Sequence, residues 1–288
     1  MYKFFALLAA ICLAGIGVAS STMAANVGEL GFTLSGTDRV DRVQLTLRDG
    51  RRSGMHSSSS YRPNELAGLN TDALRAGSGA IGFALVRDAG RVDCRGAAQR
   101  AGHAGGQCDF KADPRFAALL ASRGIEAPDE EEALGLTLVG ATSALVNAVA
   151  DAGYTRVSAD DLTGLAALGV TPAYIGELAR GGYKPANVGD LLAFKALDIS
   201  PSYVAALGRQ GYGRIPASEL IQLKALDITP EFIRGFREAG YPALPVATLI
   251  QAKALNVTPE FVRSLRPPQS SRLSADELIR LKVAGLMP

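Results

Sequence analysis

The nine residues KALDITPEF (224–232) occur twice more in closely similar form, as KALDISPSY (195–203) and KALNVTPEF (253–261). The copies begin 29 residues apart, and a fixed period of this size is typical of stacked repeat proteins. Extended in both directions, the period gives six registers, which begin at residues 113, 142, 171, 200, 229 and 258. We therefore predict six 29-residue repeats over residues 113–288.

Each register has the features of two short helices. It begins with Asp, Thr or Ser, in most cases followed by Pro, which suits an N-cap and the first helical position. About ten residues later a Gly is expected to end this helix, and a leucine stripe predicts a second helix. The residues that carry this pattern are Thr171, Pro172, Gly182, Pro201, Gly211, Pro230, Gly240 and Pro259.

The quoted stretch is then the joint between one second helix and the next first helix. Asp198, Asp227 and Asn256 share one position of this joint with Gly169. These residue types tolerate the left-handed conformation best, so we expect it there. Isolated helices of this length are marginal in water, so each pair is expected to depend on its neighbours. The sixth register replaces the Gly-Tyr mark with RPPQSS and predicts an atypical terminal repeat.

Residues 26–112 follow a different pattern, with apolar and polar residues alternating. The alternation is found in GFTLSG (31–36), RVQLTLR (42–48), AIGFALVRD (80–88), RVDCRG (91–96) and QCDFKA (107–112). It predicts a small antiparallel sheet. We expect RRSGMHSSSSYRP (51–63) to be a polar loop and NELAGLNTDALRAG (64–77) to include a helical turn. The predicted fold class is α+β, a small antiparallel β domain with one disulfide followed by an α-hairpin repeat (solenoid-like) domain.

Residues 1–25 have the pattern of an export signal. A basic start, MYK, precedes an apolar core and the small residues SSTMAA. The alternative is a retained membrane anchor, for which the apolar run is short. Because Ile11 rather than a small residue precedes Cys12, no lipid anchor is expected. We predict a periplasmic or secreted protein with no stable membrane insertion after cleavage.

Two cysteines, Cys94 and Cys108, remain after such cleavage. In an oxidising compartment they predict a disulfide that joins the two strands of a hairpin. A metal site that also uses His103 is the alternative, but it needs at least one more ligand. The formal net charge of +2 argues against a nucleic-acid surface, which needs a concentrated basic face.

Several side chains are candidates for binding or catalysis. Lysines recur at one register position (Lys195, Lys224, Lys253, Lys282), either as a basic row or as stems that cover apolar surface. Tyr154, Tyr183, Tyr212 and Tyr241 follow the helix-ending glycines, either as an aromatic ladder for a ligand or as packing residues. His56 with Ser57–Ser60 would be the centre of a hydrolase, although no HExxH, GxSxG or P-loop motif is present. APDEEEA (127–133) is interpreted as acids at a helix start rather than as a calcium loop.

The segment LIQLKALDITPEFIRGFREAGY (220–241) resembles tandem repeats of bacterial exported proteins. Similar repeats occur in extracytoplasmic parts of sensors related to antirepressor metallopeptidases, and FALVRDAGRVDCRG (83–96) resembles the β segment that accompanies them. The zinc-binding HExxH and the membrane helices of those sensors have no counterpart here, so no catalytic residue is carried over.

We therefore expect a non-catalytic module that presents a helical-repeat surface to a protein or peptide partner, with no metal, cofactor or nucleic acid. The alternative is an envelope ligand-binding sensor that holds a polysaccharide or small molecule between the β domain and the first repeats. A Ser/His hydrolase is the third hypothesis.

Overall fold

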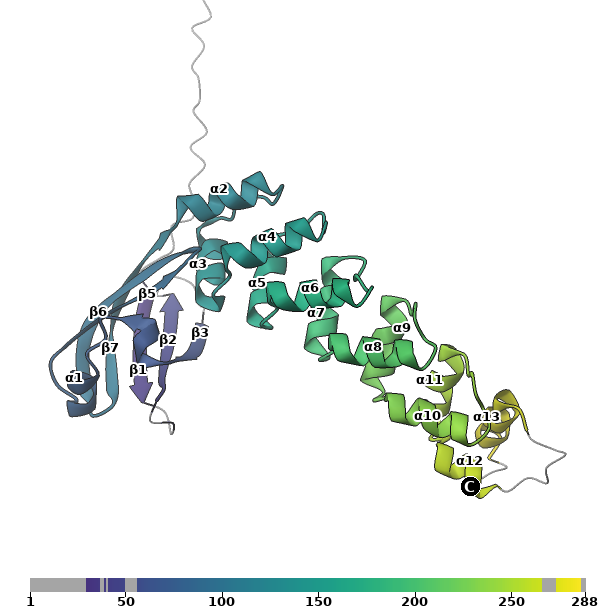
Figure 1. Ribbon diagram of the computed structural model, residues 1–288. Helices are drawn as coiled ribbons and strands as arrows, with labels where there is room; N and C mark the ends of the chain where they lie inside the picture. Colours follow the sequence, from purple (N-terminus) through teal and green to yellow (C-terminus); the bar gives the residue numbers. More distant parts are fainter. Residues whose placement is uncertain (1–29, 37–38, 40, 50–55, 266–272, 286–288) are drawn as a thin grey trace, which may run out of the picture.

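The computed structural model describes residues 30–36, 39, 41–49, 56–265 and 273–285. Within them an antiparallel sheet is followed by an elongated array of short helices that leads away from it (Figure 1). The predicted α+β class is confirmed. The predicted export signal lies outside the described residues.

Among the described residues the sheet has seven strands in the order β3-β2-β1-β7-β6-β5-β4, so the first of these strands pairs with the last one. The strands are β1 (Leu30–Gly36), β2 (Val43–Asp49), β3 (His56–Tyr61), β4 (Leu66–Ala67), β5 (Ala80–Arg87), β6 (Gly90–Arg100) and β7 (His103–Ala112). Because side chains alternate along a strand, one face collects the apolar residues. Leu30, Phe32 and Leu34 of β1 are buried there beside Leu45 and Leu47 of β2.

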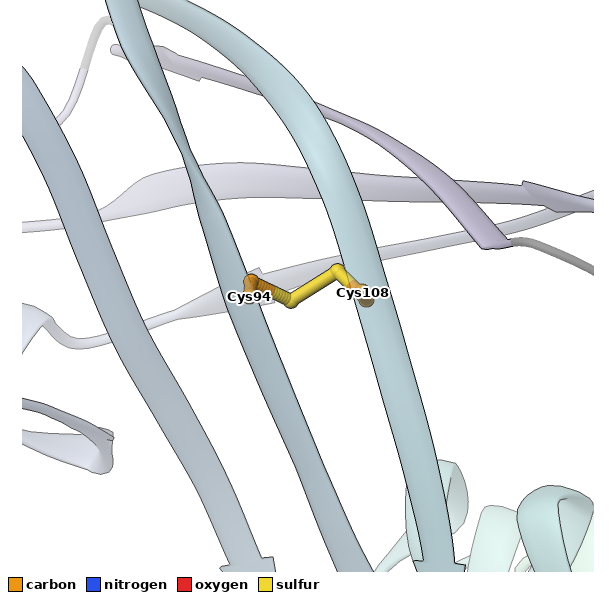
Figure 2. Close-up of a disulfide and its surroundings, with 2 residues drawn as sticks. All are labelled: Cys94 and Cys108. Atoms are coloured by element: carbon orange, nitrogen blue, oxygen red, sulfur yellow. A yellow bond between two sulfur atoms is a disulfide. The ribbon is translucent and has the colours of Figure 1, made fainter.

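The predicted disulfide is confirmed. Cys94 and Cys108 are directly opposite each other on β6 and β7, with Cα atoms 4.0 Å apart (Figure 2). The hairpin is longer than the pattern predicted, because both strands continue into the glycine-rich residues. A Cβ atom at Gly96 would collide with the Gly105 carbonyl oxygen, so the close approach of the strands requires glycine.

The prediction of a polar loop at residues 51–63 is wrong for part of that range. His56–Tyr61 form β3, which pairs with β2 along its whole length. The serines conceal the strand from a hydrophobic pattern because β3 is at the edge of the sheet and only Tyr61, opposite Val43, is buried. The helical turn expected at 64–77 is present as the 3₁₀ turn η1 (Pro63–Glu65) and α1 (Thr71–Ala76).

In the part of the chain that the structure describes, six helix pairs follow the sheet. The first helices are α2 (Pro114–Ser122), α4 (Ser143–Asp151), α6 (Pro172–Arg180), α8 (Pro201–Arg209), α10 (Pro230–Glu238) and α12 (Pro259–Ser264). The second helices are α3 (Glu130–Val139), α5 (Ala159–Ala167), α7 (Val188–Ala196), α9 (Ala217–Ala225), α11 (Val246–Ala254) and α13 (Ala275–Val283). Each first helix contacts the next first helix, and each second helix contacts the next second helix, so the array has two layers.

The repeat marks have the predicted local geometry. Thr171, Ser200, Thr229 and Thr258 each accept a hydrogen bond from the backbone N–H three residues later, and Pro172, Pro201, Pro230 and Pro259 are the first helical residues. Gly182, Gly211 and Gly240 have φ of 76°, 98° and 96°. Asp198, Asp227 and Asn256 have φ of 53°, 52° and 55°, which confirms the left-handed joint. Val170, Ile199, Ile228 and Val257 follow these joints and are buried.

Helix α3 joins the sheet to the array. Its Leu134 belongs to the apolar core of the sheet, whereas Leu136 belongs to the core of the array. The carboxylate of Asp88, in the β5–β6 turn, accepts a hydrogen bond of 2.7 Å from the backbone N–H of Ser143 at the start of α4. The sheet is thus tied to the first two repeats by packing and by a hydrogen bond.

Candidate functional site

The lysines that recur in the array lie over aromatic rings of their own repeats. The Nζ atoms of Lys195 and Lys224 are 5.0 and 5.3 Å from the ring centroids of Tyr174 and Tyr203. Lys253 and Lys282 lie in the same way over Phe232 and Phe261, at 5.0 and 4.8 Å. A cation over a ring face is attracted by the ring quadrupole. This geometry favours the interpretation of these lysines as covers of apolar surface rather than as a basic binding row.

The tyrosines near the start of two first helices have a second internal contact. The hydroxyl of Tyr174 donates to the Ile199 carbonyl at 2.7 Å, and that of Tyr203 donates to the Ile228 carbonyl at 2.8 Å. Burial, followed by the nearby carboxylates of Asp198 and Asp227, raises the pKa of each of these two tyrosines to about 12. Both tyrosines therefore hold the joint at the end of their own repeat.

The four tyrosines after the helix-ending glycines are also engaged within the array. Tyr212 and Tyr241 each donate a hydrogen bond of 2.6 Å to a backbone carbonyl of the next repeat, at Leu244 and Leu273. Tyr183 stacks on Phe194 with centroids 5.5 Å apart. Tyr154 is buried beneath Lys184, and burial with the charge of Asp190 raises its pKa to about 12. The contacts favour the packing interpretation over an open aromatic ladder.

The exposed positions of the first helices differ from repeat to repeat. In each register from 142 onward, the third residue, counted with the N-cap residue as the first, is exposed. These residues are Ala144, Ala173, Ser202, Glu231 and Glu260. Three residues further along, on the same face of the helix, stand Asn147, Gly176, Ala205, Arg234 and Arg263. The last three are exposed, whereas Asn147 and Gly176 are partly exposed and the Asn147 side-chain oxygen is buried. The buried framework is nearly constant, while this exposed stripe changes from small and uncharged to densely charged.

The proposed hydrolase residues are in β3 rather than in a loop. Neighbouring strand residues point to opposite faces, so His56 shares the exposed face with Ser58 and Ser60 but not with Ser57. The Ser58 hydroxyl is hydrogen-bonded to Gln44 and Thr46, at 2.8 and 2.9 Å. No hydrogen bond joins His56 to a carboxylate among the residues that the structure describes. The arrangement does not assemble a nucleophile, base and acid.

The acidic run at 129–132 forms the start of α3. Asp129 accepts from the Glu132 backbone N–H, and the Glu132 side chain accepts from the Asp129 backbone N–H, which is a capping box. Within the described ranges, no three His, Cys, Asp or Glu side chains are grouped as a metal would require. Two of the four carboxylates in this run, those of Asp129 and Glu132, are therefore accounted for by helix capping.

A shallow groove of about 490 Å³ lies at the junction of the sheet and the first helix pair. It is lined by Val86, Arg87, Gly90, Arg91, Lys111, Ala112, Asp113, Pro114 and Arg115. Val86, Arg91 and Lys111 are successive cross-strand partners on β5, β6 and β7, so they share the exposed face of the sheet. The sequence pattern does not reveal this site, because the site depends on the register of three strands and on where α2 begins.

The charges around the groove are partly paired. Arg87 pairs with Glu65 at 3.1 Å, and Arg115 pairs with Asp113 at 3.0 Å. Arg91 pairs with Asp93 at 2.7 Å. Hydrogen bonds from these arginines lower the pKa of Asp93 and of Asp113, so both acids are ionised at neutral pH.

The helices of the array are short. In the part of the chain that the structure describes, no single helix is long and apolar enough to cross a membrane. Three pairs of consecutive helices together have the length and apolar composition of a membrane span. The two helices of each pair meet at a bend of between 88° and 98°.

No family model matches the chain, and none of the curated proteins compared with it matches. The resemblance to exported repeat proteins therefore stays a prediction, and function has to be argued from the chain's own residues.

Proposed function

We propose that this protein is a non-catalytic interaction module that presents the exposed stripe of its first helices to a protein or peptide partner. The observation that carries this proposal is the division within the repeat between constant buried positions and variable exposed ones. Arrays of stacked helix pairs bind partners along such extended surfaces. A stripe that differs in each repeat provides a sequence-specific surface on a uniform framework.

The internal contacts of the repeat marks support this proposal. The lysines, the tyrosines and the left-handed joints that recur along the chain are used for packing within or between repeats. The residues that remain for recognition are those that vary. Export, predicted from residues 1–25, is compatible with the disulfide between Cys94 and Cys108, and it places the partner in the periplasm or outside the cell.

The experiment is site-specific photocrosslinking in the native cell with the full chain. A photoreactive residue replaces exposed alanines of the first helices, Ala173 or Ala205, or exposed alanines of the second helices, Ala196 or Ala225. We expect the same saturable crosslinked protein from both first-helix positions and from neither second-helix position. The absence of a crosslink at Ala173 and Ala205, or equal crosslinking at all four positions, would contradict the proposal.

The second candidate function is an envelope sensor that binds a polysaccharide or a small molecule. The groove at the junction of the sheet and the array favours it, because ligand sites commonly occupy junctions of this kind. Calorimetric titration of the full chain with neutral and acidic oligosaccharides tests it, and saturable binding lost on substitution of Lys111 is the expected result. If no oligosaccharide gave a measurable heat of binding, the sensor function would be contradicted.

A further inference from the structure

The groove at the sheet–array junction has an arrangement of charge that calls for an anion. Arg91 and Lys111 are directly opposite each other on β6 and β7. Like charges in such a cross-strand pair repel and destabilise the sheet. Arg91 forms an ion pair with Asp93; the charge of Lys111 also acts on the Asp93 carboxylate, but Lys111 has no ion pair of its own among the described residues. An anionic group placed between them would therefore be attracted by both side chains.

The floor of the groove is apolar and open. Val86, the partner of Arg91 on β5, is 48% exposed, which is unusual for a large hydrophobic residue in the described part of this chain. Ala112 and Pro114 continue the apolar surface towards α2. A volume of about 490 Å³ is within the range of small-ligand sites and accommodates only a few residues of a peptide.

Hydrogen bonds hold the sheet side of the groove and its helix side together. The backbone N–H of Asp113 donates to the Ala89 carbonyl at 3.0 Å, which ties the start of α2 to the β5–β6 turn. The hydrogen bond between Asp88 and Ser143 fixes the same turn to α4. A ligand therefore meets a preformed surface and does not have to order one.

We propose that this groove binds a short peptide segment of a protein partner that carries a carboxylate next to an apolar side chain. The carboxylate lies between Arg91 and Lys111, and the apolar side chain covers Val86 and Pro114. The carboxylate comes either from the C-terminus of the partner or from an internal acidic residue. The proposal rests on the proposed function only in taking the ligand to be part of a protein.

The test is fluorescence anisotropy of the full chain with labelled hexapeptides at low ionic strength. One peptide ends in leucine with a free carboxylate, a second has the same sequence with an amidated end, and a third is amidated with an internal leucine–glutamate pair. We expect saturable binding of the first, the third or both, and about tenfold weaker binding of the amidated neutral peptide. Preference for the first assigns the carboxylate to a C-terminus, and preference for the third assigns it to an internal acid.

Matched variants decide whether the groove is the site. Lys111→Glu is expected to weaken binding at least about tenfold, and Lys111→Gln, which removes the positive charge without adding a negative one, by a smaller factor. Arg209→Glu, a charge reversal at an exposed position of α8, is the control and should leave the affinity within about twofold, because α8 lies further along the array, away from the sheet (Figure 1). Circular dichroism spectra show whether each variant is folded. If Lys111→Glu is not folded, the affinity of Lys111→Gln decides the test.

Three results would overturn the proposal. They are equal binding of the neutral and carboxylate peptides, undiminished binding by both Lys111 variants, and no binding of any peptide. Binding of an oligogalacturonate, but of no peptide, with loss in Lys111→Glu would assign the groove to the sensor function instead. The crosslinking experiment on the first helices has no residue in common with this test, so the two proposals can fail separately.

Discussion

Tyr203 is half-buried between Lys224, which lies over its ring, and the Ile228 carbonyl, which accepts a hydrogen bond from its hydroxyl group. The two later repeats have Phe232 and Phe261 at the same register position, beneath Lys253 and Lys282. The lysine–ring contact is thus the constant part of this arrangement. The hydrogen bond from the ring hydroxyl to a backbone carbonyl is found in the repeats that have tyrosine at this position.

Tyr203→Phe is predicted to cost about 1 kcal/mol of unfolding free energy at pH 8, the usual net value of one hydrogen bond. The pKa of Tyr203 is raised in the folded protein to about 12 from 10.0. Between these values the unfolded chain releases the proton while the folded chain keeps it, so stability falls as pH rises. Urea unfolding from pH 8 to 11.5 should show a shallower alkaline loss in the variant. Parallel pH profiles for the two proteins would be inconsistent with this assignment.

The joints show how far single residues allow prediction. Asp198, Asp227 and Asn256 could be assigned a left-handed conformation because the same short list of residue types fills one position at a fixed period. Arg156 also has a positive φ, of 56°. Nothing in its residue type indicates this, and none of the equivalent residues that the structure describes in the other repeats shares it. The left-handed conformation of the joints could therefore be predicted because it recurs at a fixed period, whereas that of Arg156 could not.

Glycines inside the first helices have two different roles. A Cβ at Gly235 in α10 would lie 2.8 and 2.9 Å from the side-chain carbons of Pro259, the first residue of α12. Gly235 thus allows neighbouring first helices to approach each other. A Cβ at Gly208 in α8 would meet nothing within 4 Å. The first glycine is required by packing, whereas the second has no such requirement.

Two matched substitutions test this difference. Gly235→Ala is predicted to lower the free energy of unfolding by about 1–3 kcal/mol, because the added methyl group overpacks the contact with Pro259. Gly208→Ala is predicted to raise it by about 0.5–1 kcal/mol, because alanine loses less backbone entropy in a helix. Urea unfolding followed by circular dichroism measures both. The same sign for the two variants would show that packing between α10 and α12 is not the reason for Gly235.

The strands and helices differ in how well the sequence predicted them. Alternation identified the five strands β1, β2, β5, β6 and β7, and the 29-residue period identified every helix pair in the described part of the chain. Strand β3 was missed because an edge strand of serines has no apolar face to reveal it. The groove was missed because Val86, Arg91 and Lys111 are on three different strands and come together only through strand register. Periodic burial is visible in one sequence, but contacts across strands are not.

The sheet and the array share helix α3, and this decides how the whole molecule responds to damage. Leu134 and Leu136 are two residues apart on that helix, and both are completely buried. Because they point to different sides, the first packs with the sheet and the second with the array. Loss of packing at α3 should therefore destabilise both the sheet and the first repeats of the array. Further along the array, each repeat contacts only its neighbours, and damage should remain local.

Leu134→Ala is predicted to cost about 2–5 kcal/mol, the usual range for a buried leucine. Hydrogen exchange measured by mass spectrometry should show lost protection in both the β6–β7 hairpin and helices α3–α5. Leu278→Ala is the matched control, since Leu278 is a buried leucine of the last second helix, α13. Its effect should be confined to α11–α13, because a terminal repeat has one neighbour. If Leu134→Ala left the β6–β7 hairpin protected, α3 would be a passive attachment rather than the element through which the sheet and the repeats stabilise each other.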